Sequence, residues 1–265
     1  MALQRLEKIF APLSIALCLL FILGSGSLLL GSRVEYPPIV NPRLRHLTFD
    51  PVSHALKPYG WETDLIVGPD DKALVRSDIV DRESCLGMHV TQDGANDGNE
   101  WATIHVRQDI RGRAARTLFE RSFVVRVFPT FSYIQDAGHP RNVFGVEIYD
   151  NDNMLWVVFS DTNEGTYQVG RHRIVVVNTP LNKWSDRRID LGKLYESSNW
   201  DKPEMFSLTL LVGASRVLPG EFAGFIKEIR IEGSTASMQL RLWPTMNAPE
   251  ALISIEVQVQ RAETG

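Results

Sequence analysis

Side chains that could bind a ligand alternate with apolar residues in several segments of this sequence. Glu147 and Trp156 each lie between two apolar residues, and Trp101 and Tyr149 each have one apolar neighbour. Exposed aromatic rings stack on sugar rings, and polar groups beside them bond the sugar hydroxyls. If the segments are neighbouring strands, one concave face would carry six candidate ligand contacts: Trp101, Arg126, Glu147, Tyr149, Trp156 and Arg173. The pattern therefore predicts a glycan-binding face.

Glu147 is the best candidate for a catalytic acid, because it lies in the middle of an alternating segment, opposite its apolar residues. Glycoside hydrolases use two carboxyl groups that flank the scissile bond, and a second acid could come from a distant strand. A salt bridge to a neighbouring arginine on a solvated face is the simpler interpretation. The sequence has no HExxH zinc motif and no glycine-rich nucleotide loop. We therefore expect a non-catalytic domain, with a glycan-active hydrolase or lyase that uses Glu147 as the alternative.

Residues 93–100 (DGANDGNE) are rich in the oxygen ligands that calcium prefers. The segment does not fit the EF-hand template, because Ala95 occupies its third position and Ile104 its twelfth. A polar turn before the next strand explains the same residues. If a metal binds here, we expect its ligands to be Asp93, Asn96 and Asp97.

The charge of the chain indicates which classes of partner it can bind. The formal net charge is −4, which argues against a nucleic-acid binder. Residues 107–126 are nevertheless rich in arginine, and 111–116 (RGRAAR) is expected to be a loop. Arginine forks suit carboxylate or sulfate groups, but pairing with Asp109 and Glu120 explains the same charges.

Alternation of apolar and polar residues dominates the chain from Trp61 onward. A period of two predicts strands with one buried face, and the polar turn 150–153 predicts a hairpin. We expect strands at 84–90, 101–108, 122–128, 142–149, 154–160, 170–177, 206–212 and 222–232, with two more at 238–243 and 252–260. Helix is scarce, with one short turn expected at 191–197. The fold class is all-β, an antiparallel β-sandwich of the jelly-roll type.

The strand order and two segments, 77–90 with its SDIV and LGMHV and 222–231 (FAGFIKEIRI), carry a resemblance. Over residues 61–233 the chain resembles a carbohydrate-binding module or galactose-binding-like jelly-roll domain. The resemblance implies a role in binding glycan. It also implies that the domain can hold a structural calcium ion; no other cofactor is expected.

Residues 9–32 contain no charged residue. As a helix they would measure about 36 Å at ~1.5 Å per residue, enough to cross a hydrocarbon core of ~30 Å. The segment is either an uncleaved transmembrane anchor or a signal peptide cut after small residues at 25–27. Because the apolar run continues through residues 28–30, we favour the anchor.

The flanking charges do not decide the orientation, because arginine or lysine lies on both sides of residues 9–32. Since the N-terminal segment is tiny, we expect it to stay inside and the rest of the chain to be extracytoplasmic. The expected organisation is a cytoplasmic tail (1–8), an anchor (9–32), a proline-rich stalk (33–60), the sandwich (61–233) and a C-terminal hairpin (234–265).

The function predicted from these features is that of a single-pass, membrane-anchored jelly-roll domain that binds glycan or a protein partner at the cell exterior. A structural subunit of a membrane assembly is a further alternative.

Overall fold

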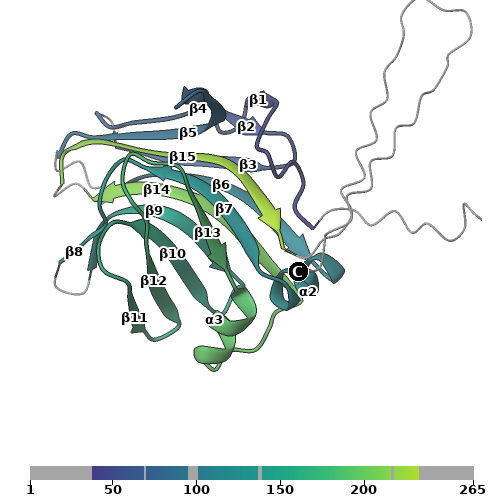
Figure 1. The fold of residues 1–265 in the computed structure, drawn as a ribbon. Coiled ribbons are helices and arrows are strands. Elements are labelled where there is room, and N and C mark those ends of the chain that lie inside the picture. Colours follow the sequence, from purple (N-terminus) through teal and green to yellow (C-terminus); the bar gives the residue numbers. More distant parts are fainter. Residues whose placement is uncertain (1–37, 69, 95–100, 137–138, 216–217, 233–265) are drawn as a thin grey trace, which may run out of the picture. The chain divides into compact units, whose positions relative to one another are not determined.

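The computed structural model describes residues 38–68, 70–94, 101–136, 139–215 and 218–232. They form a β-sandwich of two mainly antiparallel sheets (Figure 1). The larger sheet has eight strands: β3 (Glu62–Ile66), β6 (Trp101–Arg111), β8 (Ile134–Asp136), β9 (His139–Tyr149), β10 (Met154–Ser160), β11 (Gly165–Val169), β12 (His172–Asn178) and β14 (Met205–Ser215). Their order is β11-β12-β10-β9-β14-β6-β3, with β8 paired to β9. Only β10 and β12 pair in parallel among these strands.

The second sheet has five antiparallel strands: β4 (Lys72–Val80), β5 (Glu83–Gln92), β7 (Phe123–Pro129), β13 (Ser185–Ile189) and β15 (Gly220–Ile231). Their order is β13-β7-β15-β5-β4. The expected all-β fold of sandwich type is therefore confirmed for the described residues.

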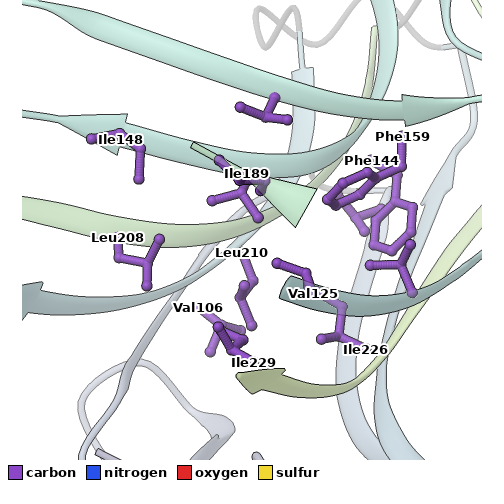
Figure 2. Close-up of a cluster of buried hydrophobic side chains, with 14 of the residues drawn as sticks. Val106, Val125, Phe144, Ile148, Phe159, Ile189, Leu208, Leu210, Ile226 and Ile229 are labelled. Carbon is purple, nitrogen blue, oxygen red and sulfur yellow. The ribbon is translucent and has the colours of Figure 1, made fainter. Parts of the chain in front are cut away.

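The main core lies between the two sheets, because the inward residues of each strand are apolar. Figure 2 shows its centre, where Leu208 and Leu210 of the larger sheet lie near Val125 and Ile226 of the smaller one. All four side chains are almost fully buried. Burial of such a residue stabilises the fold by roughly 1.5–3 kcal/mol, so this alternating pattern is the main determinant of the architecture.

Eight strands expected from alternation are present, at 83–92, 101–111, 123–129, 139–149, 154–160, 172–178, 205–215 and 220–231. The hairpin between β9 and β10 is also confirmed, and Asp150 accepts the backbone N–H groups of Asp152 and Asn153 in its turn. The helical turn expected at 191–197 is the helix α3 (Leu191–Ser197).

The expectation of a loop in the arginine-rich segment was wrong. Residues 111–116 were expected to be a loop, but helix α2 (Arg113–Glu120) begins within them. Its buried residues are Ala115, Leu118 and Phe119, which have the spacing of one helix face. The Phe119 ring packs on the Tyr195 ring of α3 at 4.8 Å. Arg113 and Arg116 therefore lie on a helix that packs against the sandwich, whereas Arg111 is the last residue of β6.

The described part of the expected stalk, residues 38–60, packs on the sandwich instead of acting as a spacer. Ile39 and Leu44 are almost fully buried and belong to the main core. The segment continues into a hairpin of β1 (Leu47–Asp50) and β2 (Ala55–Pro58). Its prolines block helix, as expected, but its apolar side chains find places in the core.

The expected tail (1–8), anchor (9–32) and C-terminal hairpin (234–265) lie outside the described residues, as do stalk residues 33–37. Within the described part of the chain, no helix has both the length and the apolar character needed to cross a membrane.

Candidate functional site

The site is built on the outer face of the eight-stranded sheet, the face turned away from the main core. Cross-strand register places Thr209 of β14 beside Arg107 of β6 and beside Glu147 of β9. Glu147 in turn lies beside Trp156 of β10. Since directly paired residues point to the same face, these four side chains form one row across four strands.

Glu147 and Trp156 are joined directly. The indole Nε1 of Trp156 donates a hydrogen bond to Oε2 of Glu147 over 2.8 Å. The ring of His172, on β12, meets the indole edge to face with the centroids 4.9 Å apart. The Nε2 atom of His172 is buried and has no hydrogen-bond partner among the described residues. A buried polar atom without a partner costs free energy, so this nitrogen has an unsatisfied hydrogen-bonding capacity.

Two histidines flank Glu147. Burial lowers the pKa of His105, on β6, while the charges of Glu147 and Asp64 act to raise it and that of Arg107 to lower it. Burial also lowers the pKa of His172, against the opposing charge of Glu147. Both rings are therefore held toward the neutral form, in which each has one nitrogen that donates and one that accepts. Neutral imidazoles suit hydroxyl groups better than they suit anions.

Apolar side chains form the floor beside this polar row. A second cluster, separate from the main core, consists of Tyr133, Val143, Val158, Ile174, Val176 and Leu211. Trp101 and Trp156 pack against it and remain partly exposed. Tyr149 and Tyr167 have 40% and 43% of their surface exposed. The face thus combines a cluster of buried apolar side chains with aromatic rings that are partly exposed.

The β3–β6 margin of the same face is charged. Arg107 donates to Oε2 of Glu62 over 3.0 Å and lies 3.6 Å from a carboxylate oxygen of Asp64. Asp109 accepts the hydroxyl of Ser207 over 2.7 Å. A pocket of about 310 Å³ lies at this margin; its lining residues include Glu62, Arg107, Asp109 and Val40.

The structure brings four of the six predicted ligand contacts to this face. Trp101 on β6, Glu147 and Tyr149 on β9, and Trp156 on β10 point to the same side of one sheet, with β14 between β6 and β9. Trp101 lies apart from the other three, beside Ser215 at the far end of β6. The expected common face is therefore present for these residues.

Arg126 does not belong to it. It lies on β7 of the other sheet, where it contacts Glu83 at 2.7 Å and Asp186 at 3.3 Å. Its guanidinium carbon lies 5.7 Å from the centroid of the Trp184 ring. Arg126 is thus part of an ion-pair network on the opposite side of the sandwich.

Arg173 does not belong to it either. Its side chain points to the side of β12 opposite His172 and is buried. Its Nη1 donates to the carbonyl of Leu194 and the hydroxyl of Ser197, each over 2.8 Å, and to the hydroxyl of Ser198. These acceptors lie at the C-terminal end of α3, so Arg173 stabilises that helix end.

The predicted set lacked several residues of the face, including Arg107 and Thr209 of the polar row and His105, His172, Tyr133 and Tyr167. His105 could have been found, because it alternates with Trp101 along the same strand. His172 and Tyr167 lie in or beside strands whose pattern does not distinguish the two faces. Tyr133 precedes the short strand β8, and no periodicity identifies it.

The expected calcium ligands are only partly described. The backbone N–H of Asp93 donates to Oδ1 of Asp71 over 3.0 Å, whereas Asn96 and Asp97 lie outside the described residues. Among the residues that are described, no group of three or more His, Cys, Asp or Glu side chains could hold a metal ion.

Comparison with known protein families finds no match, and comparison with curated proteins finds none either. Among solved structures, those similar to this chain include carbohydrate-binding modules and glycoside hydrolases of the β-sandwich jelly-roll class, the class that the sequence resembles.

One is a carbohydrate-binding module of the β-sandwich superfamily, at 13% identity and a TM-score of 0.35; the match covers 65% of this chain and 56% of that one. Another is the xyloglucanase domain of NopAA from Sinorhizobium fredii, at 11% identity and a TM-score of 0.41. The match covers 65% of this chain and 93% of that domain. A third is the catalytic domain of Humicola grisea Cel12A, at 12% identity and a TM-score of 0.39. The match covers 66% of this chain and 96% of that domain. These similarities concern the fold, and the function proposed below rests on the site itself.

Proposed function

We propose that this chain is a single-pass, membrane-anchored domain that binds glycan, without cleaving it, on the outer face of its eight-stranded sheet. Residues 9–32 would hold it in the membrane with the sandwich at the extracytoplasmic side. One observation carries the binding role: Trp156, fixed by Glu147, lies with partly accessible aromatic rings on a single sheet face.

This combination suits a sugar. A pyranose ring has an apolar face that stacks on an indole, and hydroxyls at its rim that need donors and acceptors. Glu147 supplies acceptor oxygens, and the neutral imidazoles of His105 and His172 supply both kinds of group. The fixed indole reduces the entropy that binding would otherwise cost, because its orientation is already set by its hydrogen bond.

The spacing of the acids favours binding over hydrolysis. The carboxylates of Glu62 and Asp64 lie on β3, which is separated from Glu147 on β9 by two intervening strands. Three strand spacings of ~4.8 Å correspond to about 14 Å between backbones. Glycosidases need carboxyl groups about 5–9.5 Å apart, so this separation of the backbones favours binding over hydrolysis.

A glycan array probed with the full chain in nanodiscs tests the binding role. Trp156→Ala should weaken binding to the selected glycan at least tenfold. Trp184→Ala is the matched control, because Trp184 packs on Phe128 beside the other sheet, and should change affinity less than twofold. Absence of any glycan ligand, or wild-type affinity in Trp156→Ala, would overturn the proposal.

The membrane location has its own test. After expression in cells, the full chain should stay in the membrane fraction through alkaline carbonate extraction. Protease added to the extracytoplasmic side should digest the sandwich. Release by carbonate, or protection from this protease, would contradict the proposed anchor or its orientation.

A further inference from the structure

The β1–β2 hairpin presents large apolar side chains to solvent. Phe49 has 61% of its surface exposed, and Val52, in the turn between the strands, 88%. Single exposed apolar residues are common on protein surfaces. Two exposed apolar side chains within four residues, at the tip of one hairpin, suggest a specific role.

The tip is an ordered turn rather than a frayed loop. Phe49 pairs with Leu56, and Asp50 with Ala55. Asp50 accepts the backbone N–H of Val52 over 3.0 Å and an ammonium hydrogen of Lys57 over 2.9 Å. The turn therefore holds Val52 outward, and burying it against its own domain would break these bonds.

The hairpin is also fixed to the sandwich. Ile39 and Leu44, before it, are buried in the main core. The backbone N–H of Ile229 donates to the carbonyl of Pro42 over 2.7 Å, and Nε1 of Trp61 donates to the carbonyl of Val40 over 2.8 Å. A force or contact at the hairpin is consequently transmitted to the whole domain.

Charge around the hairpin differs from that of the rest of the chain. Residues 38–60 contain three basic residues, Arg43, Arg45 and Lys57, against one acidic residue, Asp50. The whole chain has a net charge of −4. Arg43 and Arg45 are both exposed, so an anionic surface would attract this segment and repel most of the remainder.

The segment that precedes the hairpin is short. Only a few residues separate Ser32, the end of the anchor that the proposed function places in the bilayer, from Pro38, where the described structure begins. A stretch of this length spans at most about 20 Å, at ~3.3–3.6 Å per residue. Pro38 would then lie within about 20 Å of the end of the proposed anchor, which keeps the hairpin within reach of the bilayer.

We propose that the β1–β2 hairpin docks on the bilayer, with Phe49 and Val52 at the boundary between headgroups and acyl chains and with Arg43 and Arg45 on anionic headgroups. Apolar insertion combined with basic residues is a general way in which proteins bind a membrane surface. Docking would fix the orientation of the sandwich on the membrane. The inference rests on the proposed anchor, but it concerns a surface remote in sequence from the glycan-binding face.

Site-specific labelling of the full chain in liposomes tests the docking. A Val52→Cys variant carries an environment-sensitive fluorophore, and Val169→Cys is the matched control. Val169 has 76% of its surface exposed and lies on β11, at the opposite edge of the larger sheet from β3. Both variants also carry Cys18→Ser, and Cys85 is buried.

In vesicles of phosphatidylcholine and phosphatidylglycerol, doxyl-labelled lipids should quench the label at 52 at least threefold more than the label at 169. Replacing both Arg43 and Arg45 by Gln should reduce the difference. Equal quenching at the two positions, in chains that float with the vesicles, would overturn the docking and leave the anchor intact. Chains that do not float would overturn both the anchor and the docking.

Discussion

Nε1 of Trp156 and Oε2 of Glu147 lie 2.8 Å apart, and their hydrogen bond joins the adjacent strands β10 and β9 on the outer face of the larger sheet. The bond determines which way both side chains point. It also holds the indole where the His172 ring can pack against it. The pair therefore links three strands of the face, β9, β10 and β12.

Trp156→Phe should lower the free energy of unfolding by about 1–3 kcal/mol, the usual loss for a hydrogen bond to a charged group. The substitution keeps a ring but removes the donor. Glu147→Gln should cost less, because the amide oxygen still accepts the indole hydrogen. Urea denaturation of both variants measures the difference, and an equal loss in the two would mean that the charge, rather than the bond, matters.

Gly224→Ala should destabilise the fold by about 1–3 kcal/mol, the typical cost of overpacking a core. Gly224 lies on β15, and an added Cβ would come within 2.3 Å of the Phe144 ring on the opposite sheet. The close approach of the two sheets at this point requires glycine. Thermal unfolding measures the loss.

Gly165→Ala is the control for this prediction. Its added Cβ would meet only the Tyr167 ring, at 3.5 Å, which is an ordinary contact. We expect a change within ~0.5 kcal/mol, as for most surface substitutions. A loss equal to that of Gly224→Ala would show that the packing argument is wrong.

Glu83 should make the protein sensitive to acid. Its carboxylate accepts hydrogen bonds from Arg126 over 2.7 Å and from Lys227 over 2.6 Å. These donors lower its pKa from 4.5 to about 2. Because the folded pKa lies below the unfolded one, the unfolded chain takes up the proton first, and this stability is lost as the pH falls from 4.5 to about 2.

The difference in unfolding free energy between the wild type and Glu83→Gln measures this contribution. It should be constant above about pH 5.5, where both states of the wild type are ionised. It should then shrink through the acid range. A difference that stays constant down to pH 2 would contradict the assignment.

The histidines of the site should contribute to stability in a higher pH window. Burial lowers the pKa of both His105 and His172 from 6.5. As the pH falls below 6.5, the unfolded chain binds protons that the folded chain does not, so stability decreases. A variant with both histidines replaced by Gln should lose less of its melting temperature between pH 7.5 and 5.5 than the wild type. An equal loss of melting temperature in the wild type and the variant would argue against lowered pKa values for the two histidines.

Arg173→Ala should lower the unfolding free energy by about 2–4 kcal/mol, because the buried guanidinium group satisfies acceptors at the end of α3. Glycan affinity of the folded variant should stay within twofold of the wild type, since Arg173 lies on the other side of its strand. The glycan array measures the second effect, and a tenfold loss there would place Arg173 in the site.

Much of the sandwich could be predicted from the sequence, because alternation identifies a strand wherever one face is buried and the other is not. The missed strands lack that contrast. Val75 is the only fully buried side chain among the residues of β4, and none of the residues of β11 is fully buried. Helix α2 was missed because its apolar residues stand among arginines.

The site was predictable only within single strands. Alternation shows which residues of a strand share a face, but it does not show to which sheet the strand belongs, and Arg126 belongs to the other sheet. In β12 both faces are apolar: Ile174 and Val176 contact the second cluster, while Val175 packs on the main core. The sequence therefore could not show to which side of β12 the Arg173 side chain points.

The chain order of the central strands has a consequence for how the protein reaches its native state. β14 lies between β6 and β9, and β15 lies between β5 and β7. Both come from the last part of the described chain, and β14 pairs with residues of β6 about 100 positions earlier. Topologies dominated by such distant pairings fold slowly. Neither sheet can be completed until residues 205–231 have been synthesised, so a nascent chain would lack the central strands of both sheets for most of its synthesis.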